Sequence, residues 1–485
     1  MRLPTTLSSA LAGALAVTGF APLGGWPVPI LALAALFHQM RADAPRAAFL
    51  HGWAFGLGFF LAGVSWVYVS ISTYGGLPLP LALLTTLLFC AFVAVFPGLA
   101  LMLAARLAAP GFCRTALALP AAWVLLEWVR GWFLTGFPWL ALGYSQAPDS
   151  PLAGFAPALG VYGVSLAAAL AAGGLALLAV HRLKAGLGVA LLFLAGWGLQ
   201  HVEWTRPVGA PVSVALLQGN VAQDMKFQVD RLAPTMQGYA RMALATDARL
   251  VILPETALPL FRSAVPADYL NALAGPMRQR NGDLLLGLPE DDGPGVYYNS
   301  VMSLGASPEG TYRKRHLVPF GEFVPFGFRW FVDMMQIPLG DFARGAADQP
   351  PIAAAGQRLA VNVCYEDAFG AERIHAARDA TLLVNVSNDA WFGASLAPAQ
   401  HLQIGAMRSL EAGRWQLRAN NTGVTAILDH QGRVRAALPS FTTATLTGQA
   451  QGRSGETPFL RWGNVPALLL CVLLLAGAYF PKRRP

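Results

Sequence analysis

Long apolar stretches separated by short loops make up the first 200 residues of the chain, and one more lies close to the C-terminus. A helix needs about 20 apolar residues to cross a bilayer. Eight stretches come near that length: residues 7–22, 27–40, 47–71, 79–107, 117–137, 155–180, 186–200 and 462–480. Arg2 precedes the first stretch as in a signal peptide, but a second apolar stretch follows directly, so we interpret the first as a membrane span. The pattern predicts a polytopic α-helical membrane domain with about eight transmembrane helices.

Between the last two of these stretches the pattern changes to short apolar runs that alternate with amphipathic segments. Strand-like runs cover residues 212–218, 250–253, 284–288, 297–304, 359–364, 382–386 and 424–428. Helical spacing covers residues 230–244, 267–280 and 398–418. This alternation predicts an α/β domain with mixed sheets. We therefore expect a membrane domain with seven helices at residues 1–205, an α/β domain at residues 206–457, and a C-terminal transmembrane helix with a basic tail at residues 458–485.

The distribution of charge predicts how the helices cross the membrane. Charged residues make up only 12% of the chain, 55% of the residues are apolar, and the mean hydropathy is +0.47. Ten Lys and Arg lie in the connections on one side of the predicted helices, and the connections on the other side have none. The positive-inside rule then places both termini in the cytoplasm and the α/β domain outside it. The rest of the chain is close to neutral, so the net charge of +8 reflects topology and gives no support to nucleic-acid binding.

Two charged residues lie inside the fifth predicted span. Glu127 and Arg130 are three positions apart and therefore on one face of a helix. Charges within a membrane usually pair with each other or line a cavity. We expect either a structural pair or a contact with a lipid head group.

One cysteine stands in a setting that suits a nucleophile. Four cysteines are too few and too scattered to predict a disulfide framework or a zinc site. Cys364 is the one in the polar domain, where a predicted buried strand ends beside Glu366 and Asp367. A free cysteine is most often a small buried packing residue, and the alternative is a catalytic thiol. The cysteine by itself leaves both interpretations open.

Two further ionisable residues also follow predicted strands. Glu255 comes directly after the run 250–253 and a proline, where an ordinary solvated carboxylate is the simplest interpretation. Lys314 stands in a basic tripeptide, which is typical of a solvated turn or a membrane-surface patch. The chain has only four lysines, and the polar domain keeps Lys226 and Lys314. A lysine retained in so arginine-rich a chain suggests a use for its compact, titratable ammonium.

A Cys, a Glu and a Lys together would make a complete site for acyl transfer. A thiol with a pKa near 8.5 is mostly protonated at neutral pH, so a carboxylate base must take its proton while a nearby ammonium favours the thiolate. The same ammonium can stabilise the oxyanion of a tetrahedral intermediate. This chemistry requires no metal and no cofactor. The polar domain has no glycine-rich phosphate loop, no His pair at metal spacing and no GxSxG elbow.

Three motifs in order along the polar domain resemble the nitrilase (carbon–nitrogen hydrolase) superfamily. They are Leu-Pro-Glu ending at Glu255, Lys314 followed by Leu-Val-Pro-Phe-Gly-Glu ending at Glu322, and Val-Cys-Tyr-Glu around Cys364. The segment Val-Ser-Asn-Asp-Ala-Trp-Phe, which contains Asn388, is similar to one membrane branch of that superfamily, the apolipoprotein N-acyltransferases. The resemblance implies a nitrilase-like αββα sandwich between seven preceding membrane helices and one that follows.

The resemblance also implies roles for individual residues. Glu255 would be the general base, Lys314 the oxyanion stabiliser and Cys364 the nucleophile. Glu322 would orient Lys314, Glu366 would be a supporting acid beside the nucleophile, and Asn388 would also support the site. The chain departs from the pattern at Phe227, where a tryptophan is expected.

The implied reaction is ping-pong acyl transfer at the extracytoplasmic face of the bacterial inner membrane. Cys364 would take an acyl chain from a phospholipid, and the thioester would pass it to the α-amine of an S-diacylglyceryl-cysteine apolipoprotein. We expect a monomer with no nucleic-acid partner. The apolar loop at 320–342, which includes Trp330 and Phe331, is either packed on its domain or a lid that dips into the interface. Phe227, Trp330 and Phe331 are the expected substrate-access residues.

Two other functions compete with this one. A membrane-tethered amidase or nitrilase would use the same triad, and water would resolve its thioester. A transporter with an external binding domain would need charged or broken helices at the midplane of paired repeats, and these spans offer little beyond Glu127 and Arg130.

Overall fold

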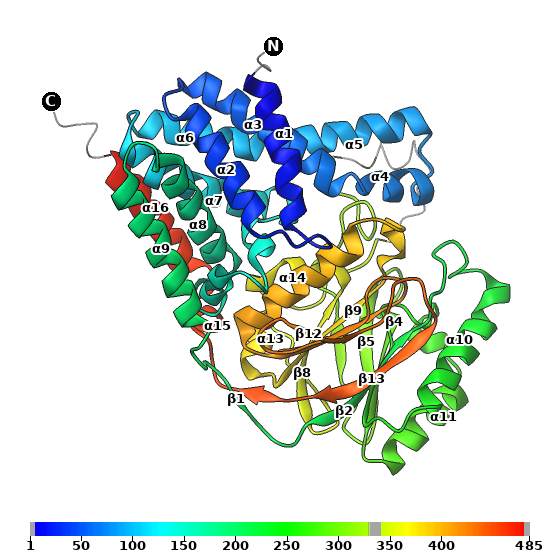
Figure 1. Ribbon diagram of the computed structural model, residues 1–485. Helices are drawn as coiled ribbons and strands as arrows, with labels where there is room; N and C mark the ends of the chain where they lie inside the picture. Colours follow the sequence, from blue (N-terminus) through cyan, green and yellow to red (C-terminus); the bar gives the residue numbers. More distant parts are fainter. Residues whose placement is uncertain (1–4, 328, 330–340, 480–485) are drawn as a thin grey trace. The chain divides into compact units, whose positions relative to one another are not determined.

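The computed structural model describes residues 5–327, 329 and 341–479. The chain forms two compact units, which are described separately here (Figure 1). The helical unit comprises Met1–Tyr68, Pro78–Glu203 and Arg461–Pro485, and the sandwich unit comprises Val69–Leu77 and Trp204–Leu460. Trp330 and Phe331, two of the predicted access residues, lie outside the described residues.

Each predicted apolar stretch overlaps at least one helix of the helical unit. The helices are α1 (Thr5–Ala16), α2 (Pro27–Met40), α3 (Pro45–Val64), α5 (Leu79–Val93), α6 (Val95–Leu107), α7 (Leu119–Arg130), α8 (Ala156–Leu177), α9 (Arg182–Leu199) and α16 (Val465–Tyr479). Among the described residues, four segments are long and apolar enough to cross a membrane: Pro45–Val64, Leu79–Leu107, Pro151–Leu177 and Arg182–Leu199. Shorter apolar helices cover Thr5–Gly19, Pro27–Met40 and Val465–Tyr479. Length and composition thus support four of the eight predicted spans.

Glu127 and Arg130 anchor the same irregular segment. The Glu127 carboxylate accepts hydrogen bonds from the Leu142 backbone N–H at 2.8 Å and from the Ser165 hydroxyl. The Arg130 guanidinium donates to the carbonyl oxygens of Phe137 and, at 2.7 Å, Trp139. Both side chains are buried. Backbone groups that no helix satisfies are costly to leave unpaired, so these bonds give both residues a structural role.

Two six-stranded sheets form the centre of the sandwich unit. One has the order β13 (Ala444–Ala450), β2 (Val212–Gln218), β3 (Leu250–Ile252), β4 (Asp283–Asp291), β5 (Tyr297–Gly305), β6 (Thr311–Arg313). The other has the order β12 (Val434–Ala437), β11 (Ala426–Leu428), β10 (Trp415–Asn420), β9 (Leu382–Ser387), β8 (Gln357–Val363), β7 (Ile352–Ala354). Parallel pairs β2–β3, β3–β4, β8–β9 and β9–β10 stand beside antiparallel ones, so both sheets are mixed, as predicted.

The two sheets pack face to face, and helices cover their outer faces. Val214 and Leu216 of β2 belong to the apolar core between the sheets, whereas Ala215 and Leu217 belong to the core under α10 (Val229–Leu244) and α11 (Ala267–Gln279). This alternation follows the two-residue period of a strand buried on both faces. On the other sheet, Leu383 packs in a cluster with residues of α13 (Ile374–Asp379) and α14 (Ala397–Ala412). The result is the predicted αββα sandwich (Figure 1).

The structure corrects one predicted element and adds several. The helix expected at 398–418 ends at Ala412, because Gly413 adopts a left-handed conformation with φ of +61° and terminates it. Residues Trp415–Asn420 then form β10 between β9 and β11. The short strands β6 and β7 and the strands β12 and β13 were also not predicted.

The segment Val69–Leu77 belongs to the sandwich unit although it lies between α3 and α5 in sequence. The Ser70 hydroxyl donates to the Trp391 carbonyl oxygen at 2.8 Å, and the Tyr74 ring contacts the Trp391 ring edge-on at a centroid distance of 5.3 Å. Trp391 follows Asn388 by three residues, so this segment lies against a loop that carries a predicted site residue.

Candidate active site

The predicted triad comes from the ends of three strands in two sheets. Glu255 follows β3 and Lys314 follows β6, both in the first sheet, whereas Cys364 follows β8 in the second. All three side chains are buried. The backbone at Glu255 is tightly packed against β4, since a Cβ added to Gly287 would stand 2.6 Å from the Pro254 carbonyl oxygen and 3.0 Å from the Glu255 Cα. Glycine at that position lets the two strands approach.

Lys314 lies between two carboxylates. Its Nζ is 2.9 Å from Glu322 Oε1 and 3.4 Å from Glu255 Oε1. Burial by itself lowers the pKa of the Lys314 ammonium, but the charges of Glu322 and Glu255 outweigh this effect and hold its pKa above the usual value. Lys314 is therefore a fixed cation with 1% of its side chain exposed.

Asn299 of β5 completes this cluster, and no motif around it predicts this position. Its Nδ2 donates to Glu255 Oε1 at 2.7 Å and to Glu322 Oε1 at 2.9 Å, and its backbone carbonyl oxygen accepts the Lys314 backbone N–H at 2.8 Å. The Asn299 amide and the Lys314 ammonium thus both lie against the two buried carboxylates of Glu255 and Glu322. This arrangement keeps Glu255 and Glu322 beside Lys314.

The surroundings of Cys364 favour its protonated thiol. Burial raises the pKa of the Cys364 thiol well above its usual value, the charge of Glu255 raises it further, and Lys314 lowers it. The thiolate is the reactive form of cysteine. If Cys364 acts as a nucleophile, a base must therefore take its proton, and the carboxylate with the largest electrostatic effect on the thiol is Glu255.

Glu366 lies two residues after Cys364 in sequence, and its carboxylate bonds to other parts of the chain. Its Oε1 accepts the backbone N–H groups of Arg315 and His316, and its Oε2 accepts that of Val363. The Tyr312 hydroxyl donates to both oxygens at 2.8 and 3.0 Å. Glu366 thereby joins the chain after β6 to the chain after β8, which positions Lys314 and Cys364 relative to each other.

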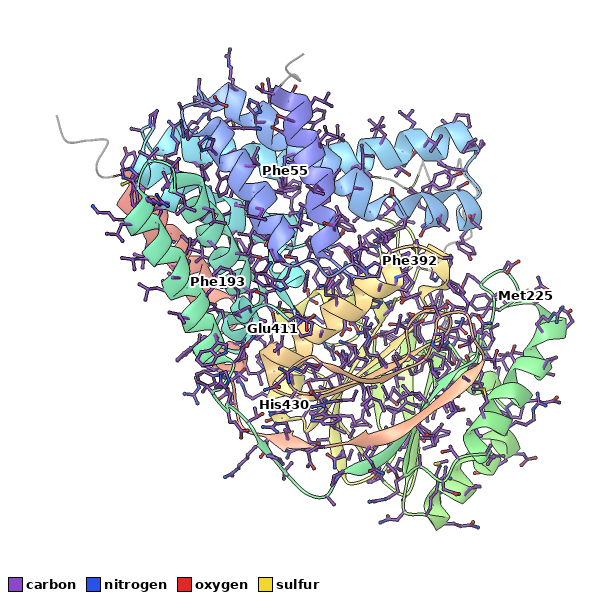
Figure 2. All side chains as sticks on the ribbon, in the orientation of Figure 1. Phe55, Phe193, Met225, Phe392, Glu411 and His430 are labelled. Carbon is purple, nitrogen blue, oxygen red and sulfur yellow. The ribbon has the colours of Figure 1, made fainter. Side chains whose placement is uncertain are left out.

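Asn388 and Phe227 lie on loops at the edge of the sandwich unit. The Asn388 side chain donates to Gln223 Oε1 at 2.6 Å and accepts from Asn421 Nδ2 at 2.9 Å. The Gln223 loop also carries Phe227, whose ring is 65% exposed. Met225 in that loop and Phe392 near Asn388 lie toward the same edge of the sandwich unit (Figure 2).

A second buried lysine lies close to the triad. Lys226 Nζ donates to the Glu255 backbone carbonyl oxygen at 3.1 Å, and 4% of Lys226 is exposed. Burial lowers the pKa of the Lys226 ammonium to about 8, although the charges of Glu255 and Cys364 oppose the shift. Lys226 therefore changes charge in a pH range where Lys314 stays positive.

Replacing Lys226 with methionine is expected to stabilise the protein at pH 7, with a gain that shrinks as the pH rises. Below about pH 8 the folded protein carries the full cost of the buried charge. Between that pH and about 10.5 the unfolded chain binds more protons, so the wild type gains up to about 3 kcal/mol relative to the variant. Thermal unfolding of both proteins from pH 6.5 to 9.5 measures this. The exposed Lys184 replaced by methionine is the control, and a pH-independent difference at Lys226 would contradict the prediction.

The described residues contain no group of three or more His, Cys, Asp or Glu side chains placed to hold a metal ion. The αββα sandwich, with Glu, Lys and Cys at the ends of its strands, defines the carbon–nitrogen hydrolase class of fold. Residues 213–459 match the family model described as carbon–nitrogen hydrolase. Residues 12–174 match the model described as the apolipoprotein N-acyltransferase N-terminal domain.

Similarity to bacterial relatives extends over nearly the full chain. The apolipoprotein N-acyltransferase of Nitrosomonas europaea is 50% identical, with 97% of each chain covered. Those of Chromobacterium violaceum and Ralstonia nicotianae are each 47% identical, covering 99% and 98% of this chain and 94% and 93% of the relatives. The chain belongs to the apolipoprotein N-acyltransferase family.

Proposed function

We propose that the protein transfers an acyl chain from a phospholipid to the N-terminal α-amine of S-diacylglyceryl-cysteine apolipoproteins. The observation that carries the proposal is the buried Lys314 between Glu255 and Glu322, electrostatically coupled to the Cys364 thiol. A thiol, a base and a fixed cation suit acyl transfer through a thioester. Membership of the family supplies the acceptor class.

In the first half-reaction Glu255 takes the proton of the Cys364 thiol as the sulfur attacks the ester carbonyl carbon of the phospholipid. The Lys314 ammonium stabilises the oxyanion that forms, an interaction worth about 3 kcal/mol for one donor. The C–O ester bond then breaks, and Glu255 returns the proton to the departing oxygen. The products are a thioester on Cys364 and a lysophospholipid.

In the second half-reaction the apolipoprotein α-amine attacks the thioester carbonyl carbon. The pKa of such an amine near 7.7–8.0 leaves a usable neutral fraction. Glu255 takes a proton from the attacking nitrogen and gives it to the sulfur as the C–S bond breaks. An amide is formed and the Cys364 thiol is restored.

Other residues support these steps in different ways. Glu322 holds the Lys314 ammonium at 2.9 Å and accepts the Val318 N–H at 2.8 Å through its second oxygen. Glu366 holds the chain just before Cys364 by accepting the Val363 N–H. Asn388 links the loop after β9 to Gln223 and Asn421. Phe227, with its exposed ring, and Trp330 and Phe331 are the proposed substrate-access residues.

The proposed arrangement has eight transmembrane helices, cytoplasmic termini and an extracytoplasmic catalytic domain in a monomeric inner-membrane protein. The domains are those at residues 1–205, 206–457 and 458–485. Four helices are long and apolar enough to cross a membrane. Helix α7 and the three shorter apolar helices bring the proposed number of transmembrane helices to eight. The segment Val69–Leu77, which has no Lys or Arg, packs within the sandwich unit, as a connection on the catalytic side should.

The experiment that tests the function uses the full-length protein and an acyl-labelled phospholipid. Label that hydroxylamine removes should appear on the wild type, and Cys364→Ser should abolish it. Adding a diacylglyceryl-cysteine lipopeptide should move the label to its α-amine. Label that passes only to water would favour the amidase or nitrilase alternative, and failure of the wild type to become labelled would exclude acyl transfer through Cys364.

A further inference from the structure

The nucleophile sits in an unusual backbone conformation. Cys364 has a φ of +55°, in the left-handed region that residues with a side chain rarely adopt. Such a conformation is strained and persists only where the surroundings hold it. It occurs where β8 ends at Val363 and a turn of 3₁₀ helix, Cys364–Ala368, begins. The orientation of the Cys364 Sγ depends on this backbone.

Two side chains hold the Cys364 carbonyl group. Asn385 Nδ2 donates to its oxygen at 3.2 Å, and His401 Nε2 lies 3.1 Å from it. Asn385 comes from the neighbouring strand β9 and also donates to Asn362 Oδ1 at 2.7 Å. His401 comes from α14, which packs on this sheet. A strand and a helix thus reach the same backbone oxygen.

The other nitrogen of His401 faces a carboxylate. His401 Nδ1 is 3.0 Å from Asp389 Oδ1, and both side chains are 1% exposed. Asn420 Nδ2 donates to Asp389 Oδ2 at 2.7 Å. Burial raises the pKa of Asp389, but His401, Arg418 and Asn420 outweigh it and leave the pKa below its usual value. A carboxylate and a carbonyl oxygen only accept hydrogen bonds, so each ring nitrogen must carry a proton.

We propose that His401 is a positioning residue for the nucleophile: its ring, anchored by Asp389, donates to the Cys364 carbonyl oxygen and holds the left-handed backbone that presents Sγ to the acyl donor. The inference rests on the proposed function, in which Cys364 is the nucleophile. A charged donor makes a stronger hydrogen bond than a neutral one, and the Asp389 carboxylate compensates its buried charge.

Two amide substitutions separate the contacts of His401. Asparagine places a nitrogen at the distance of Nδ1 from Cβ, so His401→Asn keeps a partner for Asp389 and cannot reach the Cys364 carbonyl oxygen. Glutamine places its nitrogen at the distance of Nε2, so His401→Gln can still donate to that oxygen. The two variants carry the same functional group and differ by one methylene.

The full-length variants are compared in single-turnover acylation by a labelled phospholipid. The dependence of the acylation rate on phospholipid concentration separates kcat from KM. His401→Asn should lower kcat by about 50-fold with KM within about twofold, because a small displacement of a reacting atom costs on the order of 10²-fold. His401→Gln should recover the rate to within about fivefold of wild type. Thermal unfolding is recorded in parallel.

The opposite order, with His401→Asn active and His401→Gln inactive, would overturn the proposal and assign the ring to the Asp389 contact alone. Equal rates in both variants would also overturn it. If His401→Gln fails to fold because Asp389 loses its cation, the double variant His401→Gln/Asp389→Asn removes the uncompensated charge and is measured in its place. Failure of the proposed function itself would appear separately, as wild-type protein that takes no label on Cys364.

Discussion

Replacing Lys314 with methionine is expected to lower the rate of acyl-enzyme formation by about 10³-fold. The loss of one oxyanion donor accounts for about 10²–10³ of this. The remainder follows because Lys314 is the cation that lowers the Cys364 pKa against the effects of burial and Glu255. Single-turnover labelling of the purified protein by an acyl-labelled phospholipid measures the rate.

The matched comparison is Lys226→Met, which removes the other buried lysine of the sandwich unit. Lys226 contacts the Glu255 main chain and makes no hydrogen bond to its carboxylate among the described contacts. We therefore expect a smaller loss, about tenfold or less. A Lys314→Met variant that folds and keeps more than a tenth of the wild-type rate would rule out the oxyanion role.

Glu255→Gln is expected to reduce both half-reactions by about 10³–10⁴-fold. The glutamine side chain is nearly isosteric and its oxygen can still accept the bonds from Asn299 and Lys314, but it cannot take a proton from the Cys364 thiol. The raised pKa of that thiol makes the base indispensable at neutral pH. Acylation by phospholipid and transfer from preformed thioester to lipopeptide are measured separately.

Glu322→Gln is the control for this variant, because Glu322 shares Asn299 and Lys314 with Glu255. It should cost about tenfold, since it weakens the hold on Lys314 and leaves the proton acceptor in place. Equal losses at the two positions would mean that the carboxylates act as one electrostatic unit, and Glu255 would lose its separate role as base.

The sequence was informative where an ionisable residue follows an apolar strand. Glu255, Lys314 and Cys364 each occupy such a position, and the structure brings Glu255 and Lys314 to 3.4 Å although they are far apart in sequence. Most strands could be predicted because an apolar run of about four to eight residues bounded by turn residues has few alternatives. The helix beginning at Ala397 was extended too far, although Gly413 was a recognisable stop signal.

The contacts of two other residues at the candidate site could not be predicted in this way. Asn299 lies inside an otherwise ordinary strand, and nothing in its neighbours indicates that its amide meets two carboxylates. Glu366 was expected to support the nucleophile as an acid, yet its partners are backbone N–H groups and the Tyr312 hydroxyl. Such contacts depend on how the strands and turns are arranged in space. The pattern of residue types along the chain does not reveal that arrangement.

The two sheets of the sandwich each carry part of the proposed active site. Ile252 and Tyr312 lie in the inter-sheet core just before Glu255 and Lys314, and Val363 lies there just before Cys364. The thickness of this apolar layer therefore helps to set the distance that a proton would cross between the Cys364 sulfur and the Glu255 carboxylate in the proposed reaction. We therefore expect the loss of a methyl group from these core side chains to slow the proposed reaction, even though the methyl group lies away from the polar atoms of the site.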